Sequence, residues 1–73
     1  MMSVHNRLWK YDDEHIAGYT EDRKVMSLIR KRYPVMATYR RGLQGKEFAR
    51  QYLMPMEVAD DMVQIFNVRL EKR

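Results

Sequence analysis

The sequence predicts an α+β domain with the element order ββαββα, in which two helices cover one face of a four-stranded antiparallel sheet. Residues 16–33 and 48–66 carry the same pattern: alternating apolar and polar residues, a polar or proline stop, then apolar residues at helical spacing. The chain has 73 residues, enough for one domain with a single small core. A core of this size gives little stability by itself, so a homodimer is also expected.

The first two strands are predicted to form a hairpin. Residues 8–11 form a short run rich in aromatic residues, and residues 15–19 resume a strand pattern. Between them Asp12, Asp13 and Glu14 make a polar turn. An alternative reading of this turn is a metal site with His15, but adjacent residues in a turn point in different directions, so we expect a solvated turn.

The first helix is expected to begin at Thr20 as its N-cap and to end before Pro34. Acidic residues follow Thr20 and a basic run, residues 30–32, precedes Pro34, which suits both ends of the helix dipole. The apolar stripe of this helix, at positions i, i+3, i+4 and i+8, consists of Val25, Leu28, Ile29 and Tyr33.

The second half of the chain repeats the order. Residues 35–40 and 47–54 alternate as strands, and the glycine-bounded segment 42–45 turns between them. Pro55 fits the first position of a second helix, with Glu57 in its first turn. The apolar stripe of this helix consists of Val58, Met62, Ile65 and Phe66, extended by Leu70.

Alternation along residues 47–54 does not identify the buried face of the sheet. Phe48, Arg50, Tyr52 and Met54 share one side, and residues 49, 51 and 53 share the other, so both sides carry apolar groups. A sheet covered by helices on one face only would then present apolar groups on its other face. This pattern indicates that something else also covers that second face in part.

Charge is distributed unevenly. The chain carries 14 Lys and Arg against 10 Asp and Glu, a net charge of +4. Basic residues gather in segments 23–32 and 40–50, whereas acidic residues gather at 12–14 and 57–61. Such polarity favours an oriented encounter with a polyanion or an acidic protein surface.

The leading interpretation is a small, non-enzymatic nucleic-acid-binding module. Aromatic rings interleaved with arginines can stack unpaired bases while the cations hold phosphates, and Trp9, Tyr11 and Tyr39 are possible neighbours of such a row. Glycines in the turn at 42–45 would let the backbone approach a phosphate. The candidate contact residues are Arg30, Lys31, Arg32, Arg40, Arg41, Lys46, Phe48, Arg50 and Tyr52.

Other interpretations remain open at this point. The aromatic residues are equally suited to a helix-covered core, the glycines to turning the chain, and the basic run to compensating a helix dipole. The main competing function is a protein-interaction module, inhibitory or regulatory, that uses an uncovered sheet face or an edge strand. A dimer with a purely structural role is a third. The seven methionines suit a small core or an adaptable protein-binding surface.

The sequence gives little support for catalysis. Cysteine is absent, and the chain has only two histidines and no recognisable nucleotide-binding motif. We therefore expect neither an enzyme nor a bound cofactor or metal ion. The absence of cysteine, together with the lack of a leader or a long apolar run, predicts a cytoplasmic protein without a membrane partner.

Overall fold

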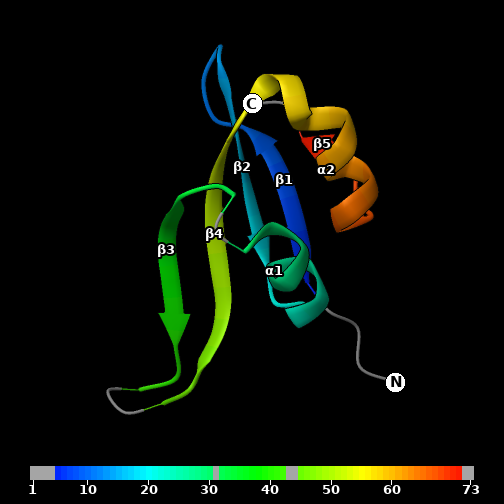
Figure 1. Ribbon diagram of the computed structural model, residues 1–73. Helices are drawn as coiled ribbons and strands as arrows, with labels where there is room; N and C mark the ends of the chain where they lie inside the picture. Colours follow the sequence, from blue (N-terminus) through cyan, green and yellow to red (C-terminus); the bar gives the residue numbers. More distant parts are fainter. Residues whose placement is uncertain (1–4, 31, 43–44, 72–73) are drawn as a thin grey trace.

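A computed structural model describes residues 5–30, 32–42 and 45–71 (Figure 1). The elements are β1 (Asn6–Lys10), β2 (His15–Thr20), α1 (Arg23–Ile29), β3 (Val35–Arg40), β4 (Glu47–Pro55), the 3₁₀ turn η1 (Met56–Val58), α2 (Ala59–Phe66) and β5 (Leu70–Glu71). The α+β class is confirmed, with both predicted helices and all four predicted strands present.

The sheet has five strands in the order β3-β4-β2-β1-β5. Neighbouring strands are antiparallel except for β5, which pairs parallel to β1. The prediction of four antiparallel strands missed β5, because a strand of two residues is too short to show alternation. The predicted ββαββα repeat is not confirmed: the hairpin β1–β2 lies inside the sheet, whereas β3 of the hairpin β3–β4 lies at its edge.

Both helices pack on one face of the sheet, in front of it in Figure 1, as expected. Side chains from α1 and α2 form one core with side chains of β1, β2 and β4. Its buried members are Leu8, Ile16, Val25, Ile29, Tyr52, Met54, Met62 and Phe66. The side of β4 that carries Tyr52 and Met54 is therefore the covered side, which alternation alone left undecided.

Gly18 lies directly against the Phe66 side chain of α2. A Cβ atom at this position would stand 2.7 Å from Cζ of Phe66 and 2.8 Å from Cε of Met54. The Phe66 ring therefore rests directly on the backbone of β2, and any side chain at position 18 would push it away.

Helix α1 begins two residues later than predicted. Its N-cap is Asp22, whose carboxylate accepts a hydrogen bond from the backbone N–H of Lys24 at 2.8 Å. Thr20, the predicted cap, is instead the fully buried last residue of β2. Its hydroxyl donates to Oδ1 of Asn6 at 2.6 Å and accepts from the N–H of Asp22 at 2.9 Å, so it joins β1 to the start of the helix.

Helix α1 also ends earlier than Pro34 required. Arg30 terminates it with φ 40° and ψ −117°, a conformation that side-chain-bearing residues rarely adopt. The stripe is accordingly shorter than predicted: Val25 and Ile29 are buried, Met26 joins them, and Leu28 is 57% exposed. Tyr33 lies beyond the helix and packs against the core from there.

The second helical segment starts as a 3₁₀ turn. Pro55 closes β4 and caps η1, which continues directly into α2. The predicted stripe is confirmed for this helix, with Met62 and Phe66 buried and its other members packed against the core. Asn67 ends α2 in the left-handed conformation, at φ 56°. Leu70 belongs to β5 and not to the helix.

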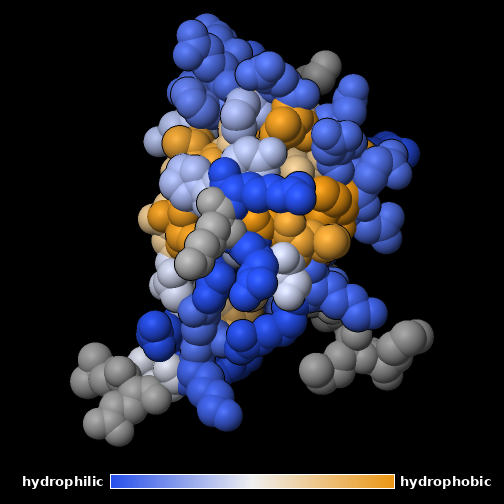
Figure 2. All heavy atoms as spheres, in the orientation of Figure 1, coloured by the Kyte–Doolittle hydropathy of each residue, from blue (hydrophilic) through white to orange (hydrophobic). Residues whose placement is uncertain are grey.

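The helix layer contacts β1 and β2 and leaves the far half of the β3–β4 hairpin uncovered (Figure 1). Figure 2, drawn from the helix side, shows a mainly hydrophilic surface around this hairpin and hydrophobic surface nearer the middle of the molecule. Among the described residues, no helix has the length and apolar character needed to cross a lipid bilayer.

Candidate nucleic-acid interface

Five of the predicted contact residues lie on the two opposite sides of the sheet around the β3–β4 hairpin. Arg30, Arg40 and Arg50 lie on the helix side, whereas Arg41 and Phe48 lie on the side without helices. We call the second side the open face. It consists of the sheet surface opposite Leu8, Gly18 and Tyr52, which face the core.

A β-bulge places Phe48 on the open face. Tyr39 pairs with Ala49 and Arg40 pairs with Glu47, so residue 48 is an extra residue in β4. Simple alternation would put Phe48 on the side of Tyr52; instead its ring centroid lies 6.4 Å from that of Tyr39. The same bulge brings Glu47 and Arg50 together on the helix side, where their side chains form an ion pair.

Tyr52 is not available for stacking. It is completely buried under the helices, as a member of the core. The predicted row of Phe48, Arg50 and Tyr52 is therefore wrong, because the bulge and the helix layer separate its members. Of these three residues only Phe48 lies on the open face.

Within the described strands, four aromatic side chains share the open face: Trp9 on β1, Tyr19 on β2, Tyr39 on β3 and Phe48 on β4. Tyr19 and Tyr39 meet across β4 in an edge-to-face contact, with ring centroids 5.5 Å apart. The Tyr39 hydroxyl donates to Oε1 of Gln51 at 3.1 Å, which fixes its orientation over that strand. We call these four residues the aromatic row.

An arginine lies over each end of the aromatic row. The Arg7 guanidinium carbon is 5.8 Å from the centroid of the Trp9 ring, and the Arg41 guanidinium carbon is 4.9 Å from that of Phe48. Arg7 also forms a bidentate pair with the carboxylate of Glu71 on β5, at 2.8 and 3.1 Å. Arg41 makes no such pair in the described part of the chain.

The aromatic row is only partly exposed. Tyr39 is 37% exposed and its three companions less; the rings of Tyr19, Tyr39 and Phe48 contact one another in sequence. Ala17 and Ala49 are completely buried although no helix covers them. The pKa of Tyr19 is raised to about 12. Burial is the largest cause, and the 2.8 Å hydrogen bond from the hydroxyl to Glu21 is the second.

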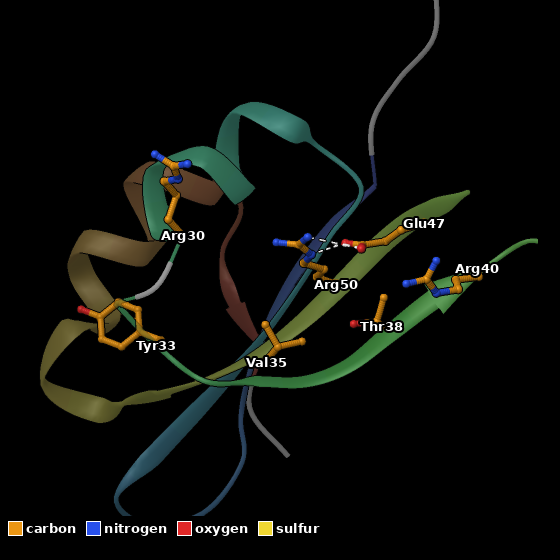
Figure 3. A pocket seen from close by; sticks show the side chains of 7 residues that line it. All are labelled: Arg30, Tyr33, Val35, Thr38, Arg40, Glu47 and Arg50. Carbon is orange, nitrogen blue, oxygen red and sulfur yellow. Dashed lines mark hydrogen bonds and ion pairs between the residues drawn. The ribbon is translucent and has the colours of Figure 1, made fainter. Parts of the chain in front are cut away.

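On the helix side, arginines from three elements line a groove of about 570 Å³ between the end of α1 and the β3–β4 hairpin (Figure 3). We call it the arginine groove. Arg50 stands in the middle, with Arg40 on the β3 side and Arg30 at the rim formed by α1 (Figure 3). The remaining lining residues are Tyr33, Val35, Thr38 and Glu47.

Glu47 is the only carboxylate among the described residues that line the arginine groove. Hydrogen bonds from Arg50 lower the pKa of the Glu47 carboxyl below its usual range, and the charges of Arg40 and Arg23 act in the same direction. Arg23 also donates to the Glu47 carbonyl at 3.0 Å. Positive charge therefore exceeds negative charge in this groove, and one arginine is already neutralised.

Two further predicted contact residues that the structure describes take no part in either surface. Arg32 and Lys46 are exposed, and neither lines the groove. Lys31 lies outside the described residues, as do positions 43 and 44 of the predicted hairpin tip. Gly42 has φ 69°, so glycine is needed there for the turn itself.

Sequence reasoning missed Arg7 and Tyr19 and named Trp9 and Tyr39 only as neighbours. Their common face follows from the register, since Arg7 pairs with Tyr19 and Trp9 with Ala17. The odd-numbered residues of β1 and β2 could have been recognised as one face once Gly18 was identified as the site of close helix contact.

The acidic turn at residues 12–14 is exposed to solvent. Oδ1 of Asp12 accepts from the backbone N–H of Glu14 at 2.8 Å and lies 2.9 Å from Nδ1 of His15. In the described ranges, no three His, Asp or Glu side chains are grouped as metal ligands. The hydrogen bond to His15 lowers the pKa of Asp12.

Comparisons of this chain with protein-family models, with curated proteins and with solved structures find no match. What the protein binds must therefore be inferred from the geometry of the two surfaces.

Proposed function

We propose that the protein binds single-stranded nucleic acid on the open face. The observation that carries this proposal is the aromatic row, which has an arginine over each of its two ends. A non-enzymatic binding role is consistent with the charge of the chain, +4 in total.

The chemistry of the row suits unpaired bases. Stacking on aromatic side chains contributes about 1–3 kcal/mol per base and tolerates any sequence, since every base has a flat π surface. Arginines beside such rings hold the phosphates that link the stacked bases. Arg41 has no carboxylate partner among the described residues and is therefore the better placed of the two to bind a phosphate. Arg7 already pairs with Glu71, which partly neutralises its charge.

Single strands are favoured over duplexes for a geometric reason. Bases in a duplex stack on one another, so their flat surfaces are not available to side chains on a sheet. A row of rings across four strands offers several stacking positions to an extended single strand, and no described helix projects from the open face toward a groove.

Trp9 supplies a direct readout, because it is the only tryptophan in the chain. Titration with labelled single-stranded DNA, RNA and duplex DNA at low and moderate salt should give single-strand binding by anisotropy. Trp9 fluorescence should be quenched at the same concentrations. The affinity should fall with rising salt, with a slope of about −0.7 per phosphate contacted.

Tyr39 provides the decisive substitution. Tyr39→Ala should weaken single-strand binding about 5- to 150-fold, the loss of one stacked base. Tyr39→Phe should bind like the original protein, because it keeps the ring and loses only the hydrogen bond to Gln51. If Tyr39→Ala binds as tightly as Tyr39→Phe, the aromatic row is not the binding surface.

Arg41 tests the electrostatic part. Arg41→Gln should weaken binding and reduce the salt slope, since one phosphate contact is lost. Lys24→Gln removes the same charge from an exposed position of α1 on the opposite side of the sheet and serves as the control. Equal effects of the two substitutions would mean that only net charge matters.

A second candidate function rests on the edge strand β3. Val35 is 44% exposed and Met36 37%, so this edge carries apolar side chains beside unpaired backbone groups. Strand addition by a protein partner or a second copy of the chain would cover them. Sedimentation at increasing protein concentration tests self-association, which Met36→Lys should abolish; a monomer at all concentrations would leave only a different protein as the partner.

A further inference from the structure

The arginine groove holds more positive charge than the fold requires. Its described lining contains three guanidinium groups, from the C-cap of α1, from β3 and from β4, and a single carboxylate. Like charges that line one groove repel one another, and a bound anion would relieve this repulsion. The groove opens on the helix side of the β3–β4 hairpin, so it is separate from the aromatic row on the open face (Figure 3).

The Arg50 side chain is fixed in orientation at the centre of this groove by Glu47. Its Nε and Nη2 donate to the two oxygens of Glu47, and the Nη2 bond measures 3.2 Å. A guanidinium binds two oxygens of a phosphate in the same bidentate geometry in which Arg50 binds the two oxygens of this carboxylate. Glu47 thus supplies, within the free protein, the kind of partner that an external oxyanion would offer.

A buried hydroxyl lies beside Arg50 without an acceptor. Oη of Tyr52 is inaccessible to solvent, and its proton has no acceptor among the described residues. The hydroxyl is close enough to Arg50 to help raise the pKa of that guanidinium. Arginine offers only donors, so the Tyr52 proton still needs an acceptor oxygen, and buried groups of this kind rarely remain unpaired.

Arg30 provides an independent indication. It ends α1 at φ 40° and ψ −117°, a region in which glycine is far more stable than any residue with a Cβ. Strained residues of this kind persist mainly where the side chain serves a site. Here the strained residue is an arginine, and its side chain forms one rim of the groove.

We propose that the arginine groove binds a phosphate-class oxyanion of two or more negative charges, held by Arg50 and Arg40 with Arg30 at the outer rim. A phosphate monoester or pyrophosphate carries such a charge, whereas a single internal phosphodiester carries one. Binding releases Glu47 from Arg50, so this carboxylate competes with the anion. The site is independent of the proposed single-strand binding, since no residue of the aromatic row lines it.

Calorimetric titration with sodium pyrophosphate and with inorganic phosphate, at constant ionic strength, tests this site. Arg30→Gly removes one cation and also the backbone strain, so it should melt at a temperature no lower than the original protein and bind pyrophosphate about tenfold more weakly. Glu47→Gln should bind more tightly, because the competing carboxylate is gone. Lys24→Gln should leave affinity unchanged.

Two oligonucleotides identify the source of the phosphate. If a 5′-phosphorylated single strand binds more tightly than its 5′-hydroxyl form, and Arg30→Gly removes the difference, the groove holds a nucleic-acid end. If pyrophosphate binds but the two strands do not differ, the ligand is a small free anion. Both results support the site.

The proposal is overturned if pyrophosphate does not bind, or if Arg30→Gly and Glu47→Gln bind it like the original protein. Tyr39→Ala separates this site from the open face, because it should lose single-strand affinity and keep its response to pyrophosphate. If Tyr39→Ala lost both single-strand binding and pyrophosphate binding, the two sites would not be independent.

Discussion

Replacement of Gly18 by alanine tests the arrangement on which both surfaces depend. The new Cβ would lie 2.7 and 2.9 Å from two carbons of the Phe66 ring and 2.8 Å from Cε of Met54. Carbon atoms in contact prefer separations of about 3.5–4.0 Å, so the ring must move by roughly 1 Å. Phe66 is 1% exposed and its ring is a rigid part of the core, whereas the terminal methyl group of Met54 is flexible.

The expected cost follows from these distances. Overpacking of a well-filled core costs about 1–3 kcal/mol. Alanine recovers about 0.4–1 kcal/mol by restricting the unfolded chain, so the net loss in the free energy of unfolding should be about 1–2 kcal/mol. For a domain of this size the melting temperature should then fall by roughly 5–15 °C.

Urea unfolding followed by circular dichroism measures this loss, and an unchanged m-value would show that the surface exposed on unfolding is the same in both proteins. Gly18→Ala combined with Phe66→Leu should be less destabilised than the sum of the two single substitutions, because the shorter side chain makes room for the Cβ. A gain in stability for Gly18→Ala would refute the close packing of α2 on this face of the sheet. The assignment of the open face, which lies opposite Gly18, would then fail as well.

Three further predictions concern individual side chains. Since the pKa of Tyr19 is raised from 10.0 to about 12, stability should fall as the pH rises from 10 toward 12, and Tyr19→Phe should remove this fall in alkaline urea titrations. Glu47 has a lowered pKa, so its ion pair with Arg50 stabilises above the ordinary carboxyl pKa and is lost as the pH falls through the folded value; Glu47→Gln should cost about 1 kcal/mol at pH 7 and nothing in strong acid. Asp22→Ala should cost about 1 kcal/mol in thermal melts through the lost N-cap, while Asp22→Asn should cost much less, and an equal loss for both would show that the charge matters more than the cap.

The elements themselves could be predicted because local patterns determine them. Alternation located all four long strands, and the stripe of α2 was correct because Met62 and Phe66 fall at helical spacing on its buried side. The limits of α1 could not be read in the same way. Thr20 and Asp22 are both good N-caps, and only the pairing of Thr20 with Arg50 in the sheet leaves the cap to Asp22.

The candidate site was predicted only in part, because a single bulge reverses which residues share a face. Alternation assigns Phe48 and Tyr52 to the same side of β4, yet the extra residue in the pairing with β3 separates them. The basic residues were recognised from composition. Their division into Arg30, Arg40 and Arg50 in the groove and Arg41 over Phe48 depends on the same bulge and on where α1 ends.

The sequence by itself determined the α+β class, the positions of the main elements and the excess of positive charge, since these depend on the order and periodicity of residues along the chain. Only the tertiary structure decided which face the helices cover, because both faces of the sheet carry apolar side chains and the choice depends on how closely Phe66 can approach Gly18. It also decided which aromatic rings meet, since Tyr19 and Tyr39 come from strands that are not adjacent in the sheet and contact each other across β4.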